Sequence, residues 1–288
     1  MASGDWTHGF AKANGLRVHY VTAGEGPLVL LLHGFPQYWY AWRKQIPALA
    51  ARFRVVAPDL RGYGDTDKPG RARDYAAASL VEDTASLIAA LGEKKARVVG
   101  HDWGGAVAWL TALERPEVVE RLAVLNCPHP AVFARALRSN PSQMLRSWYM
   151  LFFQLPGLPE RALLRRDAQG LRRLFLASSA RGVFTREDLD AYAQAAARPG
   201  ALTAALNYYR AAFRSPRAML RASDPGRKIS APTLLIWGEE DRALGKELTL
   251  GMEPLFTGPF RLVYVPGAGH WVNEERPDLV NAALADFL

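Results

Sequence analysis

Short apolar runs alternate with longer amphipathic stretches along most of the chain. The amphipathic stretches, such as Ser79–Leu91 and Ala106–Glu114, place apolar residues at steps of three and four, which predicts helices with one buried face. Strands that alternate with helices indicate crossover connections and a mostly parallel sheet covered on both faces. The strands that we expect are Arg17–Thr22, Leu28–Leu32, Arg54–Ala57, Arg97–Gly100, Leu122–Leu125, Thr233–Trp237 and Arg261–Val265.

The alternation of strands and helices breaks between about Pro128 and Ser230. This segment has no convincing strand, is rich in Arg, Ala, Leu and aromatic residues, and is interrupted by prolines. The strand pattern resumes at APTLLIWG, so the sheet is completed after the excursion. We therefore expect one discontinuous α/β core, formed by residues 1–128 and 230–288, with an all-helical cap at residues 129–229.

Length and composition fit a globular protein with one large domain and an insertion, since 49% of the 288 residues are hydrophobic. The longest aliphatic run, Leu28–Leu32, is far shorter than the roughly 20 residues that span a bilayer. The first residues, MASGDWTHGF, lack the pattern of a signal peptide. The single cysteine, Cys127, fits a reducing compartment. We expect a cytoplasmic protein without membrane insertion, present as a monomer or homodimer.

The formal net charge of +8 comes mostly from arginine. A nucleic-acid binder would gather these arginines on one face together with exposed aromatic residues. Here they are scattered among leucines at helical spacing, for example at Arg161, Arg165, Arg172 and Arg173, as on a solvated helix face. The sequence also holds no glycine-rich phosphate loop. We expect no nucleic-acid partner, no cofactor and no metal.

The stretch VVGHDWGGAVAW, from Val98 to Trp109, combines a β-branched run, a tight turn flanked by glycines and a helix of small residues. In serine hydrolases the centre of such a turn reads G-x-S-x-G, but here Asp102 stands in place of the serine. Asp102 could simply cap the helix, although capping does not require glycines on both sides. The pattern predicts a nucleophilic aspartate at the carboxyl end of a strand, where open α/β sheets bind ligands.

A carboxylate nucleophile suits a particular class of substrate. Aspartate, with an ordinary pKa near ~3.9, is already ionised at neutral pH and needs no base before it attacks. Attack on an ester carbonyl would form an anhydride, whereas attack on a saturated carbon with a leaving group forms an alkyl ester that water can cleave. The substrate expected from this residue is an epoxide or an alkyl halide, with water as the second reactant.

Cleavage of that ester requires a general base, usually a histidine held by a carboxylate. His270, in GAGHWVNEERPDL, follows the last predicted strand, and Asp241, in LLIWGEEDRAL, follows the preceding one beside Glu239 and Glu240. The order of nucleophile, acid and histidine along the chain is that of α/β-hydrolases. The other histidines do not follow a late strand: His8, His19, His33, His101 and His129.

The oxyanion that forms during ester cleavage needs N–H donors. LLLHGFPQYWYAWR follows the second predicted strand, so its loop can offer the main-chain N–H of Phe35, with His33 and Gly34 shaping the turn. Trp103, the residue after Asp102, can offer a second N–H. The sequence leaves open whether a cis peptide precedes Pro36.

The leaving group depends on the predicted cap. An opening epoxide develops an alkoxide that must be protonated, whereas a departing halide needs only N–H donors. Tyrosine, with an ordinary pKa near ~10, stays protonated at neutral pH and can protonate an alkoxide. Tyr149, Tyr208 and Tyr209 lie in the cap segment, although each taken singly could be a core aromatic.

The sequence resembles the epoxide hydrolases of the α/β-hydrolase fold superfamily across nearly the whole chain. That fold is a mostly parallel central sheet flanked by helices, with an all-helical cap inserted between core strands. Three motifs, HGFPQYWYAWR, GHDWGGAVAW and GAGHWVNEERP, also occur in related dehalogenases. Two motifs of the cap, SWYMLFFQLPGLPE and LNYYRA, are narrower, and DLRGYGDTDKP and LNCPHP add to the resemblance.

The resemblance implies that an epoxide is converted to a vicinal diol by Asp102, His270 and Asp241, with Phe35 and Trp103 in the oxyanion hole.

By the same resemblance, Tyr149 and Tyr209 bind and protonate the epoxide oxygen, while Tyr208 is a packing neighbour. The aromatic residues that we expect to contact substrate are Trp39, Trp148, Phe152, Phe153 and Tyr208.

Two other functions stay open. A haloalkane or haloacid (fluoroacetate-type) dehalogenase could use the same aspartate, and HGFPQ also resembles fluoroacetate dehalogenases. Those enzymes follow the nucleophile with arginine, where this chain has Trp103, and haloalkane dehalogenases have Asn or Trp where Phe35 stands. A receptor of this fold that binds a ligand without turnover has no need to keep nucleophile, acid and histidine together.

Overall fold

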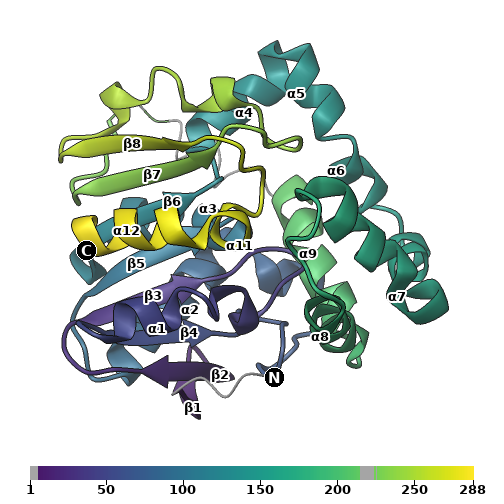
Figure 1. Cartoon of the computed structure of the whole chain (residues 1–288), viewed down its shortest axis with the longest axis horizontal. Coiled ribbons are helices and arrows are strands. Elements are labelled where there is room, and N and C mark those ends of the chain that lie inside the picture. Colours follow the sequence, from purple (N-terminus) through teal and green to yellow (C-terminus); the bar gives the residue numbers. More distant parts are fainter. Residues whose placement is uncertain (1–5, 215–223, 225) are drawn as a thin grey trace.

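The computed structural model describes residues 6–214, 224 and 226–288. Its centre is an eight-stranded sheet with the strand order β1-β2-β4-β3-β5-β6-β7-β8 (Figure 1). Strands β1 and β2 pair antiparallel, as do β2 and β4, and every other neighbouring pair is parallel. The mostly parallel sheet that the sequence predicts is therefore confirmed. The strands are β1 (Thr7–Ala13), β2 (Leu16–Ala23), β3 (Leu28–Leu32), β4 (Arg54–Pro58), β5 (Ala96–His101), β6 (Val119–Leu125), β7 (Thr233–Gly238) and β8 (Phe260–Val265).

Strand β1 was missing from the strands that the sequence predicts. It lies at the edge of the sheet, pairs only with β2 in the described structure, and leaves most of its residues exposed or half-buried. A strand that buries neither face has no need for an apolar run, so the hydrophobic pattern that reveals the other strands is absent here.

Helices cover both faces of the sheet, and the alternation of side chains in each strand supplies both cores. In β3, Leu31 points to one face and packs in a cluster with Ile46, whereas Leu30 points to the other and shares a cluster with Trp109. Helices α1 (Ile46–Ala50) and α12 (Pro277–Phe287) cover the first face, and α2 (Ala77–Ala90) and α3 (Trp103–Glu114) cover the second (Figure 1). The carboxyl ends of the parallel strands β5–β8 therefore lie side by side along one edge of the sheet.

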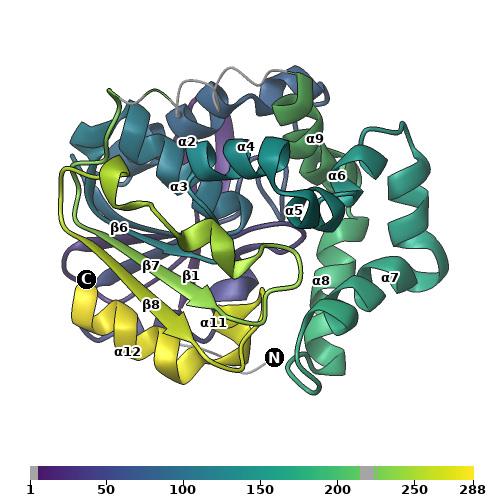
Figure 2. The same cartoon turned by 90° about the horizontal axis from the view of Figure 1, so that it is seen from above.

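The described residues between β6 and β7 contain six helices and no strand. They gather at one end of the sheet (Figure 2). Helix α7 is broken at residues 165–168, three of which have positive φ. The division into residues 1–128, 129–229 and 230–288 stays a prediction, and residues 215–223 and 225 lie outside the described part of the chain. The helices are α4 (Pro130–Ser139), α5 (Pro141–Arg146), α6 (Tyr149–Phe152), α7 (Leu158–Ser178), α8 (Arg186–Ala197) and α9 (Ala201–Arg214).

The remaining helical elements are short. No helix among the described residues combines the length and the apolar character needed to cross a membrane. The short elements are η1 (Trp39–Trp42), η2 (Ala72–Tyr75), η3 (Pro116–Val118), η4 (Lys246–Thr249), η5 (Glu253–Leu255) and α11 (Val272–Glu275).

Candidate active site

Asp102 occupies a sharp turn between β5 and α3, with a φ of 50° that residues with side chains rarely adopt. A Cβ atom on Gly100 would lie 2.3 Å from the carbonyl oxygen of Gly104, and one on Gly104 would lie 2.1 Å from that of Leu32. Only glycine therefore allows the strand and the helix to approach this closely. Strained backbone of this kind is typical of functional sites, where the surrounding structure maintains it.

Main-chain N–H groups hold one side of the Asp102 carboxylate. Phe35 donates its N–H to Oδ1 of Asp102 over 2.7 Å, and Trp103 donates a second main-chain N–H to this carboxylate. The Phe35–Pro36 peptide is cis. The two donors predicted to form an oxyanion hole both bind the Asp102 carboxylate, and Phe35 binds its Oδ1 atom.

His270 lies between the two carboxylates with which the sequence grouped it. Its Nδ1 atom is 2.8 Å from Oδ2 of Asp241, and its Nε2 atom is 3.6 Å from Oδ2 of Asp102. His270 follows β8 and Asp241 follows β7, so both stand at the carboxyl ends of neighbouring strands. The three residues are brought together by the order of strands in the sheet.

The charges of these groups are coupled. Burial lowers the pKa of His270, but the carboxylates of Asp241 and Asp102 outweigh burial and raise it to about 10. Burial raises the pKa of the Asp102 carboxyl, but the hydrogen bond and charge of His270 outweigh this effect and lower it. At neutral pH the resting site therefore holds two carboxylates and an imidazolium.

Asp241 accepts hydrogen bonds from four donors, of which the sequence indicated only His270. Asn126 donates its side-chain amide to Oδ2 of Asp241 over 2.9 Å, and the N–H groups of Ala243 and Leu244 donate to Oδ1. The Asn126 carbonyl accepts the N–H of Gly238, so both halves of its amide are used. Asn126 comes directly after β6, and a polar residue at the end of a buried strand is the signal that would have found it.

Two tyrosines from different helices face one another beside Asp102. Tyr149 begins α6 and Tyr209 lies on α9, and their ring centroids are 6.0 Å apart at an angle of 81°. Burial raises the pKa of both phenols, and the negative charge of Asp102 raises them further. Both phenols therefore stay protonated at neutral pH, as a proton donor to an alkoxide requires.

Arg210 ties the two tyrosine-bearing helices together. From α9 its Nε atom donates to the carbonyl of Phe153 over 3.0 Å, and its Nη2 atom donates to that of Leu155 over 3.0 Å. Its Nη1 atom lies 2.9 Å from Oε1 of Glu160 at the start of α7. The arginine that follows the tyrosine in LNYYRA thus fixes the end of α6 relative to α9, a structural role that the motif alone did not reveal.

A cavity of about 390 Å³ opens above Asp102. Apart from Asp102 and the hydroxyl groups of tyrosines, its wall is almost entirely apolar, with contributions from Leu80, Leu110 and Phe133. A cavity of this size and lining suits a small molecule whose reactive group is polar and whose remaining surface is apolar.

The five aromatic residues that we expected to contact substrate lie in different environments. Only Tyr208 lines the cavity, and its hydroxyl donates to the carbonyl of Arg61. Phe152 and Phe153 lie outside the lining, and Phe153 is buried with its ring centroid 5.0 Å from that of Tyr209, so it supports the cavity wall from behind.

Trp39 and Trp148 do not belong to the residues that line the cavity, and their contact with substrate stays a prediction. Trp39 is buried against Trp6, and its main-chain N–H donates to Asp59. Trp148 turns outward and is 63% exposed. Helical spacing does not reveal which side of the short α5–α6 segment faces the cavity.

The remaining histidines near the site have structural partners. His101 lies next to Asp102, and its Nε2 atom is 2.8 Å from the main-chain carbonyl oxygen of His270. Burial and the charge of His270 lower the pKa of His101 to about 4, so it is neutral and acts as a donor to that carbonyl. His33 accepts the N–H of Leu60 beneath the loop that holds Phe35.

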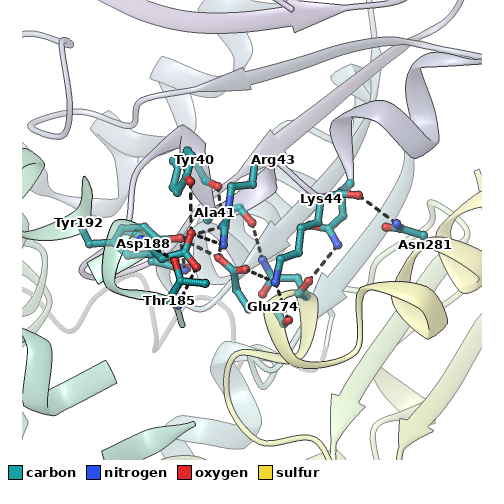
Figure 3. Close-up of polar contacts among 12 residues, drawn as sticks. Tyr40, Ala41, Arg43, Lys44, Thr185, Asp188, Tyr192, Glu274 and Asn281 are labelled. Carbon is teal, nitrogen blue, oxygen red and sulfur yellow. Dashed lines mark hydrogen bonds and ion pairs between the residues drawn. The ribbon is translucent and has the colours of Figure 1, made fainter. Parts of the chain in front are cut away.

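A buried polar network joins the cap helices to the segment that follows His270 (Figure 3). Glu274 on α11 receives a hydrogen bond from Tyr192 of α8 over 2.8 Å and forms ion pairs with Arg43 and Lys44. Arg43 also contacts Asp188 of α8 over 2.8 Å. Neither the charges nor the spacing of these residues indicated this network, because its members come from three distant segments.

One cluster outside the cavity has the composition of a metal site: His19, Asp59 and Asp65. The ring nitrogens of His19 already contact Asp59 at 2.7 Å and His8 at 2.9 Å, and Asp65 pairs with Arg198. Because these donor atoms have protein partners, we assign no metal to them.

Known proteins with this arrangement were found by sequence and by structure. The family described as the alpha/beta hydrolase fold matches residues 27–277. Human epoxide hydrolase 4 is 41% identical over 96% of this chain and 77% of its own length, and the AB hydrolase superfamily protein YfhM of Bacillus subtilis is 42% identical over 97% and 96%.

Among solved structures, the epoxide hydrolase of Bacillus megaterium in complex with an inhibitor superposes with a TM-score of 0.89. It is 32% identical, over 97% of this chain and 99% of that one. Relatives named as epoxide hydrolases thus match both the sequence and the fold. The chain belongs to the α/β-hydrolase fold family, in the branch of that family that contains the epoxide hydrolases.

Proposed function

We propose that the protein hydrolyses epoxides to vicinal diols through a covalent ester on Asp102. The observation that carries the proposal is the pairing of an ionised carboxylate with two protonated phenols at one apolar cavity. The carboxylate can attack a ring carbon while the phenols bind the ring oxygen. The relatives named as epoxide hydrolases support this assignment of substrate class.

The first step forms the ester. The Asp102 oxygen that does not accept the N–H of Phe35 attacks a ring carbon, and the bond between that carbon and the ring oxygen breaks. The electron pair goes to the ring oxygen, which takes a proton from Tyr149 or Tyr209. An alkoxide is far more basic than a phenolate, so the transfer is favourable even though burial raises the pKa of both phenols.

Formation of the ester prepares the second step. The ester removes the negative charge of Asp102, which is one of the two charges that raise the pKa of His270. His270 then loses its proton more readily, and the phenolate left by ring opening takes that proton, so His270 becomes a neutral base while Asp241 keeps its ring oriented. The reaction itself thus removes the negative charge of Asp102 that favours the protonated form of His270 in the resting enzyme.

Water completes the cycle. His270 takes a proton from water as the water oxygen attacks the carbonyl carbon of the ester, and the oxyanion receives the N–H groups of Phe35 and Trp103. The bond from that carbon to the alkyl oxygen breaks, the alkyl oxygen takes the remaining proton of the water from the new carboxyl group, and the diol leaves with an oxygen that came from Asp102. His270 keeps the proton that it took from water, so Asp102, His270 and the phenol return to their resting states and one epoxide and one water give one diol.

A single turnover in water enriched in oxygen-18, with enzyme in excess over styrene oxide, tests the ester. The diol should be almost unlabelled, and the peptide that contains Asp102 should gain the heavy oxygen by mass spectrometry. Many turnovers should label the diol, which controls for the enrichment. Label in the diol of the first turnover would show direct attack by water and would contradict the ester.

The His270→Gln variant traps the same intermediate. It should release little diol, and the peptide with Asp102 should gain the full mass of the epoxide, because ring opening adds the substrate without loss of atoms. Tight binding of epoxides without turnover by the unmodified protein would instead indicate a receptor, and release of halide from haloalkanes without diol formation would indicate a dehalogenase.

A further inference from the structure

One side of the cap carries large apolar side chains in contact with solvent. They recur at steps of one to four residues along α5, α6 and the beginning of α7, and each is between 45% and 74% exposed. We call this set the apolar cap face, and it consists of Met144, Leu145, Trp148, Leu151, Leu155 and Leu158.

The packing of the cap does not account for this face, because the opposite side of the same segment makes the internal contacts. Gln143 donates to the carbonyl of Ala243 and accepts the N–H of Gly245, Met150 lines the cavity, and Phe153 is buried. A helix that packs on one side normally presents polar residues to water on the other. Apolar side chains gathered at the surface indicate a binding surface.

The net charge of the protein comes from the segment of the chain that carries this face. Residues 129–214 contain 13 Arg, no Lys and five Asp or Glu, so they carry the entire formal net charge of +8. Several of these arginines are exposed, and their side chains take part in none of the ion pairs between described residues. They are Arg135, Arg138, Arg161, Arg165, Arg166, Arg173 and Arg181.

Helices α5, α6 and α7 form the outer edge of the molecule, away from the sheet (Figure 1). An edge that combines exposed leucines and a tryptophan with unpaired arginines is complementary to an anionic lipid surface, where apolar side chains enter the headgroup region and arginines meet phosphates. We propose that the apolar cap face docks the protein peripherally on anionic lipid.

Charge also decides between lipid and a second copy of this chain. A symmetric dimer built on the apolar cap face would bring the same arginine-rich surfaces of two copies together, and like charges repel. An anionic bilayer attracts them instead. Docking does not depend on the proposed reaction. Helix α6 nevertheless contributes to both sites, since Tyr149 and Met150 lie on the cavity wall and Leu151 belongs to the apolar cap face.

Flotation with vesicles tests the proposal on the full chain. Vesicles of phosphatidylcholine with about 30 mol % phosphatidylglycerol should bind the protein, and added salt or pure phosphatidylcholine should weaken binding. Leu145→Ser with Leu151→Ser should weaken it at least about tenfold, because both leucines would leave the lipid. Leu250→Ser with Leu279→Ser, which changes exposed leucines of the core, is the matched control and should bind like the unmodified protein.

The charge component is tested separately. Arg138→Gln with Arg161→Gln should weaken binding to the anionic vesicles by about fivefold for each arginine that contacts lipid. Circular dichroism and diol formation without vesicles show that every variant is folded. The proposal is overturned if the anionic vesicles do not bind the protein, or if both leucine pairs weaken binding equally. A dimer in sedimentation that Leu145→Ser with Leu151→Ser dissociates would assign the face to a second copy.

Discussion

The Nε2 atom of His270 lies 3.6 Å from the Oδ2 atom of Asp102, as an ion pair whose partners are not yet in tight contact. The other ring nitrogen is already bonded to Asp241 at 2.8 Å. The water that attacks an ester on Asp102 has to fit between Nε2 of His270 and the carboxyl group of Asp102. A base in tight contact with the nucleophile would leave no room for this water. The geometry suits a base that acts only after the ester has formed.

Gly34→Ala should inactivate the enzyme without unfolding it. A Cβ atom at Gly34 would lie 2.4 Å from both Cβ and Oδ1 of Asp102, so the carboxylate would have to move. A displacement of this kind costs on the order of a hundredfold in kcat. Steady-state kinetics with styrene oxide measures the loss.

Gly70→Ala is the matched control, because nothing lies within 4 Å of the added atom. It should keep the activity of the unmodified protein, and the urea midpoints of both variants should be similar. Full activity of Gly34→Ala would mean that Asp102 does not react from the position seen here.

Removal of both phenols beside Asp102 should slow ring opening. Tyr149→Phe and Tyr209→Phe should each reduce kcat partly, since one phenol remains, and the double variant should lose about 10²–10⁴-fold. Rapid quench of the first turnover measures alkylation directly. Tyr264→Phe, which removes a hydroxyl that contacts Thr249, controls for the loss of a tyrosine. Undiminished alkylation in the double variant would exclude proton donation by these tyrosines.

The protonated His270 should make stability dependent on pH. Its pKa is raised from 6.5 to about 10, because the carboxylates of Asp241 and Asp102 outweigh burial. A group whose pKa is raised by folding stabilises fully below its unfolded pKa of 6.5, and this contribution is lost as the pH rises through 10. The free energy of unfolding should fall in this window by up to about 1.4 kcal/mol per pH unit from this group.

Urea unfolding at several pH values between the two pKa values measures that slope. His270→Gln removes the titrating group, so its free energy of unfolding should depend less on pH than that of the unmodified protein. Two parallel curves would mean that His270 does not bind a proton on folding.

The network around Glu274 should stabilise the junction of cap and core. Glu274→Gln removes a buried charge that faces Arg43 and Lys44, which leaves both cations underpaired. Loss of one partner from a buried ion pair costs about 3–5 kcal/mol. Urea unfolding measures this, with Glu253→Gln as control because Glu253 is exposed and in none of the ion pairs between described residues. Equal stability of both variants would contradict the assigned role.

Much of the site could be predicted because its signals are local. Gly100 and Gly104 flank Asp102 within five residues because the tight turn leaves no space for a Cβ atom at either position. His270 and Asp241 each follow an apolar run that is recognisable as a strand. Since parallel strands end at one edge of the sheet, residues at those ends lie together.

Other features were decided only by the tertiary structure. Asn126 positions Asp241, which is 115 residues away in the sequence, and Arg210 binds Phe153 and Glu160, which are 57 and 50 residues away. Local sequence patterns do not reveal contacts over such separations. Trp39 and Trp148 lie outside the residues that line the cavity, and strand β1 was missed.

The sequence by itself determined the mostly parallel fold, the family and the group of residues around Asp102, because periodicity, glycine sterics and strand ends depend on neighbours in the chain. The direction of each aromatic side chain, the Glu274 network and the exposed apolar face on the cap depend on which distant surfaces meet. That information is carried by long-range packing, which no local pattern of residues contains.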